Sequence, residues 1–179
     1  MKKLLFITAL WLSAGSAMAQ DANTAGTDAQ TPPPPPCADE LFRQFDFWVG
    51  EWDVFSTDGS VAGKNIISIE ENGCLLVERW TGVQGSTGQS YNFVDLGSKK
   101  WRQVWVSPGA TIDYEGGLNN NGAMELKGKI AYSNGNTARF KGTWTLQDDG
   151  SVRQHFQQYN KDQKKWADWF IGIYKKAAE

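Results

Sequence analysis

Five Asx-Gly dipeptides divide most of this chain into short segments. Asn-Gly and Asp-Gly accept the positive φ that tight hairpins require, so each one predicts a turn between two antiparallel strands. The segments between them are rich in Val, Ile, Thr and aromatic residues, which favour strands. The five dipeptides are Asp58-Gly59, Asn72-Gly73, Asn121-Gly122, Asn134-Gly135 and Asp149-Gly150. Their spacing predicts an all-β fold.

We expect about ten strands in a meander. They are predicted at residues 50–56, 63–70, 74–81, 89–96, 101–107, 111–117, 123–132, 137–146, 151–159 and 166–175. Only residues 38–47 are predicted to be helical, because Asp39 can cap a helix on which Leu41, Phe42 and Phe45 share one side. Consecutive short hairpins either stack as a sandwich or close into a barrel. Closure removes exposed strand edges, so the pattern favours an up-and-down antiparallel barrel with a short N-terminal helix.

The first residues have the features of a signal peptide. Lys2 and Lys3 precede an apolar stretch over residues 4–12, which is too short to span a bilayer. Ala17-Met18-Ala19 has the small-x-small form of a cleavage site. Residues 1–19 are therefore predicted to be a signal peptide, and the mature protein is predicted to be periplasmic or secreted.

The mature chain is predicted to be a linker followed by one domain. Residues 20–36 lack aromatic residues and end in a run of five prolines, which predicts a disordered Pro-rich linker. Residues 37–179 then form a single barrel domain. The whole chain carries a net charge of −2, and loss of the two leader lysines makes the mature protein more acidic. We therefore expect no nucleic-acid partner and, once the leader is removed, no membrane insertion.

The aromatic content predicts a β-rich core or an aromatic-lined cavity. The chain has nine tryptophans, and only Trp11 lies in the leader. In the strands at 101–107 and 151–159, polar and apolar residues occupy both faces. A filled barrel would show cleaner alternation, so the mixed faces favour a partly polar cavity. The alternative is that outward apolar residues pack on the helix or on a second copy, and both a monomer and a homodimer stay open.

The two cysteines predict one disulfide. Cys37 and Cys74 are the only cysteines, and an exported protein meets an oxidising compartment. A bond between them would link the start of the domain to the third strand and contribute about 4 kcal/mol to the free energy of unfolding.

Residues 45–53, FDFWVGEWD, are the densest motif of the chain. Gly50-Glu51-Trp52 has the G-x-W form that opens lipocalin-type barrels, in which Gly lets the chain enter the first strand and Trp plugs the base. Further matching strings are Gly73-Cys74, Glu78-Arg79-Trp80, WRQVWV at 101–106 and Gly172-Ile173-Tyr174-Lys175. Together they resemble a family of exported bacterial proteins of unassigned function with a calycin-like (lipocalin-like) barrel. The resemblance covers residues 37–176 and implies a fold and a cavity, with no activity or substrate. The strand number departs from lipocalins proper, being nearer ten than eight.

His155 is the single histidine, so a Ser-His-Asp or Cys-His mechanism would depend on it. No G-x-S-x-G motif is present and both cysteines are assigned to the disulfide, so no catalytic residue is predicted. Heme binding is disfavoured because the neighbours of His155 are amides and an arginine rather than an apolar wall. One histidine also does not complete a metal site. We expect neither a cofactor nor a metal.

The sequence favours a periplasmic barrel that binds a small amphiphilic or ring-containing molecule. Aromatic planes would supply contact area, while amides and an arginine would orient the polar end of the ligand. The predicted lining is Glu78, Trp80, Asn92, Gln103, Trp105, Tyr114, Arg153, His155 and Gln157. Two other hypotheses stay open. One is an enzyme with Glu78 or His155 as acid/base and Arg153 stabilising negative charge, and the other is a structural or assembly protein without a ligand.

Overall fold

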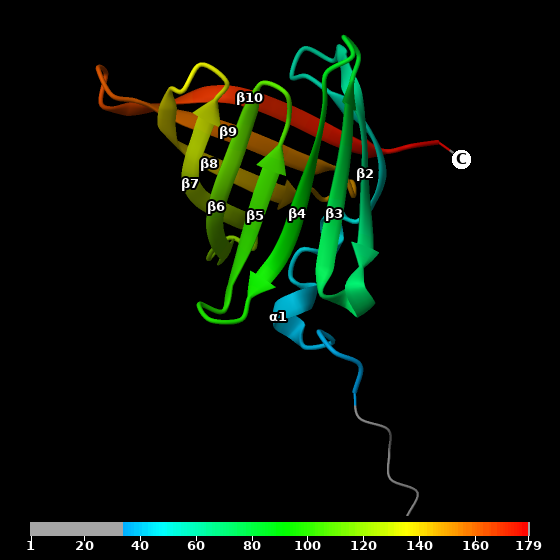
Figure 1. Cartoon of the computed structure of the whole chain (residues 1–179). Coiled ribbons are helices and arrows are strands. Elements are labelled where there is room, and N and C mark those ends of the chain that lie inside the picture. Colours follow the sequence, from blue (N-terminus) through cyan, green and yellow to red (C-terminus); the bar gives the residue numbers. More distant parts are fainter. Residues whose placement is uncertain (1–33, 179) are drawn as a thin grey trace, which may run out of the picture. The chain divides into compact units, whose positions relative to one another are not determined.

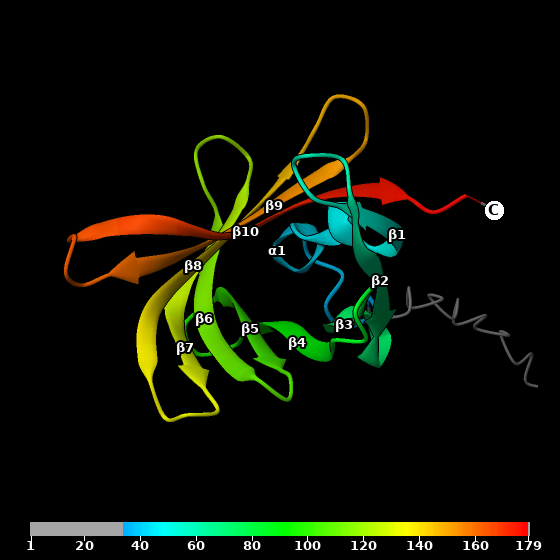
Figure 2. The same cartoon turned by 90° about the horizontal axis from the view of Figure 1, so that it is seen from above.

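The structure is a computed structural model and describes residues 34–178. Ten antiparallel strands follow one another around a closed barrel, and the first strand pairs with both the second and the last (Figures 1 and 2). This confirms the predicted all-β, up-and-down barrel. The predicted signal peptide lies outside the described residues, as does the predicted linker except for residues 34–36.

The strands lie within two residues of their predicted ends. They are β1 (Gly50–Phe55), β2 (Val61–Glu70), β3 (Leu75–Gly82), β4 (Thr87–Asp95), β5 (Lys100–Val106), β6 (Ala110–Leu118), β7 (Met124–Tyr132), β8 (Thr137–Leu146), β9 (Val152–Asn160) and β10 (Lys165–Lys176). The glycine of each Asx-Gly dipeptide has a positive φ, between 74° and 92°. The turn chemistry that predicted the fold is therefore present at all five positions.

The predicted helix at 38–47 is shorter in the structure. An α-helix, α1 (Glu40–Arg43), is followed by a 3₁₀ turn at Asp46–Trp48, and together they precede β1. Asp39 occupies the N-cap position but makes no side-chain capping bond. A single helical turn is marginal by itself, so tertiary contacts hold it, and the Trp101 indole Nε1 donates to the Leu41 carbonyl over 3.0 Å. None of the helices within residues 34–178 has the length and apolarity needed to cross a bilayer.

Aromatic side chains fill the end of the barrel near α1, which lies beneath that end in Figure 1. Phe45 and Trp48 enter from the segment before β1 and are fully buried. They stack with ring centroids 4.9 Å apart, and both pack against Trp144. We call this set the aromatic base: Phe45, Trp48, Trp52, Trp101 and Trp144.

The G-x-W segment closes the aromatic base from the side. Gly50 has a φ of +134°, which an L side chain rarely adopts, and a Cβ there would meet the Lys176 Nζ. That ammonium donates to the Val49 carbonyl and lies 3.9 Å from the centroid of Trp52. Trp52 is 1% exposed and its Nε1 donates to the Trp48 carbonyl over 2.8 Å. The missing side chain at Gly50 thus leaves room for the Lys176 side chain of β10.

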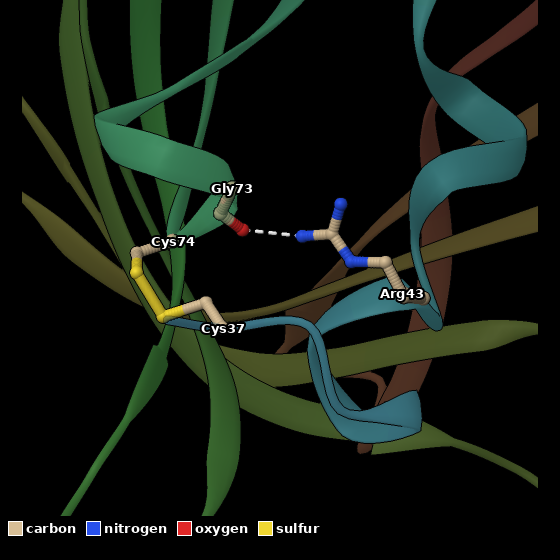
Figure 3. The surroundings of a disulfide bond; sticks show 4 residues. All are labelled: Cys37, Arg43, Gly73 and Cys74. Carbon is tan, nitrogen blue, oxygen red and sulfur yellow. Dashed lines mark hydrogen bonds between the residues drawn. A yellow bond between two sulfur atoms is a disulfide. The ribbon is translucent and has the colours of Figure 1, made fainter. Parts of the chain in front are cut away.

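The predicted disulfide is confirmed. Cys37 and Cys74 are bonded, and the neighbouring Arg43 guanidinium donates to the Gly73 carbonyl (Figure 3). Both links join the segment that carries Phe45 and Trp48 to the turn between β2 and β3. The disulfide therefore ties the aromatic base to the barrel wall.

Candidate functional site

A cavity of about 440 Å³ occupies the half of the barrel away from the aromatic base. It reaches the hairpin turns that follow β3 and β5, where Ser86, Thr87, Ser107 and Gly109 line it. The wall is mostly aromatic and aliphatic, and the deep end is polar. The wall residues are Trp80, Trp105, Ala110, Ile112, Ile130, Tyr132, Phe156, Trp169 and Phe170.

The aromatic wall depends on glycines of the neighbouring strands. A Cβ at Gly88 of β4 would lie 2.1 Å from the Trp105 ring, so the indole lies directly against the β4 backbone. Burial increases along the cavity, from the exposed Trp169 near the turns through partly buried Trp80 and Trp105 to the buried residues of the deep end. A ligand entering from the turns would meet apolar surface first.

Eight polar side chains form a hydrogen-bonded chain across the deep end of the cavity. We call this chain the polar belt. It runs over five neighbouring strands, from β6 to β2, and continues past β1 to β10 and β9, while β7 and β8 contribute apolar residues at this level. In order, its members are Tyr114, Gln103, Asn92, Ser90, Glu78, Asn65, Tyr174 and Gln154.

Two members of the polar belt donate to the Glu78 carboxyl group, one from each side. From one side, the Tyr114 hydroxyl donates to Gln103, whose amide donates to Asn92. The Asn92 amide then donates to the Ser90 hydroxyl over 2.9 Å, and Ser90 donates to the Glu78 Oε2 over 2.6 Å. Because each donor in this series points toward the carboxyl group, their polarisation adds up at Glu78.

From the other side, the Asn65 amide contacts both Glu78 and Tyr174. Its Nδ2 donates to Glu78 Oε1 over 2.7 Å and to the Tyr174 hydroxyl over 3.1 Å. Tyr174 in turn donates to the Gln154 Oε1 over 2.9 Å. The Asn65 Oδ1 is a buried acceptor with no hydrogen-bond partner among residues 34–178.

Burial has the largest effect on the pKa values of Glu78, Tyr114 and Tyr174. It raises the pKa of Glu78 from 4.5 to about 7, against the opposing effect of the Ser90 and Asn65 hydrogen bonds. Burial, followed by the nearby Glu78 charge, also holds the pKa values of Tyr114 and Tyr174 well above their usual range. The carboxyl group is thus poised between its two states near neutral pH, while both tyrosines stay protonated.

Five of the nine predicted lining residues line the cavity: Glu78, Trp80, Gln103, Trp105 and Tyr114. A sixth, Asn92, is fully buried in the polar belt behind Gln103. Glu78 and Trp80 are two residues apart on β3, as Gln103 and Trp105 are on β5, so the period of two places each pair on one face.

The inward orientation predicted for Arg153, His155 and Gln157 is wrong. The side chains of β9 alternate, and the inner face carries Gln154 and Phe156, which line the cavity. His155 instead contacts Asp168 over 2.7 Å on the outer face, where the Asp168 side chain is 62% exposed. Burying the Arg153 guanidinium without a partner would be costly, whereas the neutral Gln154 amide and the Phe156 ring fit the interior.

Besides Gln154, three members of the polar belt were not predicted from the sequence: Asn65, Ser90 and Tyr174. Each shares its face with residues that are buried in the structure, such as Ile67 beyond Asn65 and Asn92 beyond Ser90. The alternation of side chains points to them. Ser90 is two residues from Asn92 on β4, while Asn65 pairs with Trp52 and Tyr174 pairs with Val54, two residues further along β1.

The described part of the chain holds no group of three His, Cys, Asp or Glu residues placed to bind a metal ion. Comparison with known proteins adds no relative, because no protein-family profile and no curated protein sequence matches the chain. The barrel implied by the resemblance of the FDFWVGEW segment is confirmed, while membership of that exported family remains a prediction.

Proposed function

We propose that this barrel binds a small ring-containing or amphiphilic molecule in its cavity, with the apolar body against the aromatic wall and a polar group at the polar belt. The observation that supports this is an aromatic-lined space of about 440 Å³ that ends in a few convergent polar groups. Pockets for small molecules usually have a volume of roughly 300–1,000 Å³ and this mixture of lining.

The cavity also favours ligand binding over the structural hypothesis, for which a filled interior would be expected. The wall offers flat rings from separate strands, with Trp80 and Phe170 in contact at 6.4 Å between centroids. Such rings give large contact area at low cost in side-chain entropy. The disulfide fits the oxidising compartment that a periplasmic or secreted binding protein would occupy.

Binding can be tested with Nile red, a neutral aromatic dye whose fluorescence rises in apolar surroundings. We expect the wild-type barrel to bind it, and Ala110→Trp to block it because Ala110 lines the cavity. Thr111→Trp is the matched control, since Thr111 is the next residue of β6 and is exposed on the outer face. Absence of binding, or equal binding by both variants, would overturn the proposal.

A second candidate is catalysis through Glu78. Its pKa of about 7 suits a group that both accepts and donates a proton near neutral pH. His155 no longer supports this hypothesis because it lies on the outer face. Chemical conversion of a bound molecule by the wild type, lost in Glu78→Gln with binding retained, would favour catalysis over simple binding.

A further inference from the structure

At the deep end of the cavity, one carboxyl group lies among lining residues that, within residues 34–178, carry no opposite charge. Glu78 is 4% exposed and lines the cavity. The lining residues within the described chain include no Lys, Arg or His. Each carboxyl oxygen of Glu78 accepts one hydrogen bond, Oε1 from Asn65 and Oε2 from Ser90, although a carboxylate oxygen can accept two.

The polar belt supplies hydrogen-bond donors to Glu78 but no cation. An ionised carboxylate that is buried without a positive partner is costly, and neutral donors compensate only in part. Of the two buried acceptors without full compensation, Glu78 lines the cavity, while the partnerless Asn65 Oδ1 belongs to a fully buried residue outside the lining. A ligand that brings a positive charge and N–H donors into the cavity would satisfy the Glu78 carboxylate.

The wall next to this site suits the same kind of ligand. Trp80 and Trp105 lie on the strands that carry Glu78 and Gln103, two residues further toward the turns. Indole faces attract cations as well as flat apolar groups. A ligand carboxylate, by contrast, would meet the like charge of Glu78.

We propose that the cavity selects molecules that carry a protonated amine on an apolar or aromatic body, with the amine paired to the Glu78 carboxylate. The proposal rests on the proposed function and specifies its ligand class. The ammonium group donates to Glu78 at the polar belt, and the body lies along Trp80, Trp105 and Phe170. The raised pKa of Glu78 supports it, because amine binding would then be coupled to release of the carboxyl proton.

Three ligands with one body and different head groups test this: 4-phenylbutylamine, 4-phenylbutanol and 4-phenylbutyrate. Affinities are measured by isothermal titration calorimetry at pH 8, where the amine is protonated. We expect the amine to bind about 10- to 100-fold more tightly than the alcohol, which is the range for one hydrogen bond to a charged group, and the carboxylate to bind weakest.

Glu78→Gln should remove the preference for the amine and leave binding of the alcohol. The matched control is Glu115→Gln, because Glu115 is a partly exposed carboxylate paired with Lys100 on the outer face of β6. It should keep the preference of the wild type. Circular dichroism checks that both variants fold.

The wild type provides a second measurement that needs no variant. Lowering the pH from 8 to 5 protonates Glu78, so amine affinity should fall about tenfold or more while alcohol affinity stays constant. The other groups that face Glu78 do not titrate in this range: Tyr174 from β10 and Tyr114 from β6 stay neutral, and Asn65, Ser90, Asn92 and Gln154 carry no charge.

The outcomes separate the two proposals. If the alcohol binds and the amine binds no more tightly at pH 8, or if the amine preference survives in Glu78→Gln, the amine proposal is overturned and the proposed function stands. If Nile red binds and none of the three ligands does, the amine proposal is likewise overturned, and if Nile red does not bind, the proposed function itself fails.

Discussion

The two halves of this barrel are built from the same ten strands but have different interiors. The aromatic base is fully packed, with Phe45 and Trp48 at 0% exposure, while the other half encloses about 440 Å³. The difference lies in the segment before β1, which inserts Phe45 and Trp48 at one end only. An eight-stranded barrel is just wide enough for its own side chains to fill, and a ten-stranded barrel is wider. The cavity is therefore the part of the interior that no inserted segment fills.

The largest expected effect on stability comes from removing a tryptophan of the aromatic base. Trp52→Ala should lower the free energy of unfolding by about 3–5 kcal/mol, because it removes a buried indole that the packed surroundings cannot replace. Trp105→Ala in the cavity wall should cost clearly less, since that ring is only partly buried. Urea unfolding followed by circular dichroism measures both. Equal losses would mean that the two halves do not differ in packing.

Reduction of the disulfide should lower the free energy of unfolding by a similar amount, and it should loosen mainly the aromatic base. Reduction of Cys37–Cys74 should lower the free energy of unfolding by about 4 kcal/mol and the melting temperature by about 10 °C. Hydrogen exchange should rise first in residues 40–48. A double variant, Cys37→Ser with Cys74→Ser, should be insensitive to reductant. Free thiols in the unfolded, unreduced protein would contradict the prediction.

The polar belt should make stability depend on pH. Because burial raises the pKa of Glu78 from 4.5 to about 7, the folded state keeps a proton between these values that the unfolded state has released. Stability from this group is therefore greatest below about pH 4.5 and falls as the pH rises to about 7, by on the order of 3 kcal/mol at most.

Glu78→Gln isolates this contribution. The variant should lack the loss of stability between pH 5 and pH 8, so its stability relative to the wild type should rise over that range. Denaturant titrations at both pH values measure the difference. A constant difference would show that Glu78 ionises normally in the folded state.

The smallest expected effect distinguishes the two faces of β9. Gln154→Ala should weaken Nile red binding by a few-fold, because it removes a cavity wall group and leaves the Tyr174 hydroxyl without its acceptor. Arg153→Ala, on the outer face, should leave binding unchanged. The reverse result would restore the inward orientation of Arg153 that the sequence favoured.

The fold was predictable because its turns are local. Asn134-Gly135 or Asp149-Gly150 determines a hairpin from two adjacent residues, and the flanking strands follow from it. The aromatic base was partly predictable for the same reason, since Gly50 and Trp52 lie in one short motif. Its other members, Trp101 and Trp144, come from distant strands, and their contacts depend on tertiary structure.

The polar belt was less predictable because its members are neutral and scattered. On β9 the choice between Arg153-His155-Gln157 and Gln154-Phe156 depends on register, which a one-residue shift reverses. The face with Arg153, His155 and Gln157 was predicted to point into the interior because these side chains could bind the polar end of a ligand. The cost of desolvation favours Gln154 and Phe156 in the interior instead, since burying an amide and a ring costs less free energy than burying an arginine.

The pairing of β1 with β10 also determines when the barrel can form. Val54 pairs with Tyr174, so the first strand finds its second partner only among the last residues of the chain. Contacts this distant in sequence slow folding, and until they form, β1 and β10 each keep an unpaired edge open to other chains. During synthesis the barrel cannot close until β10, at residues 165–176, has emerged.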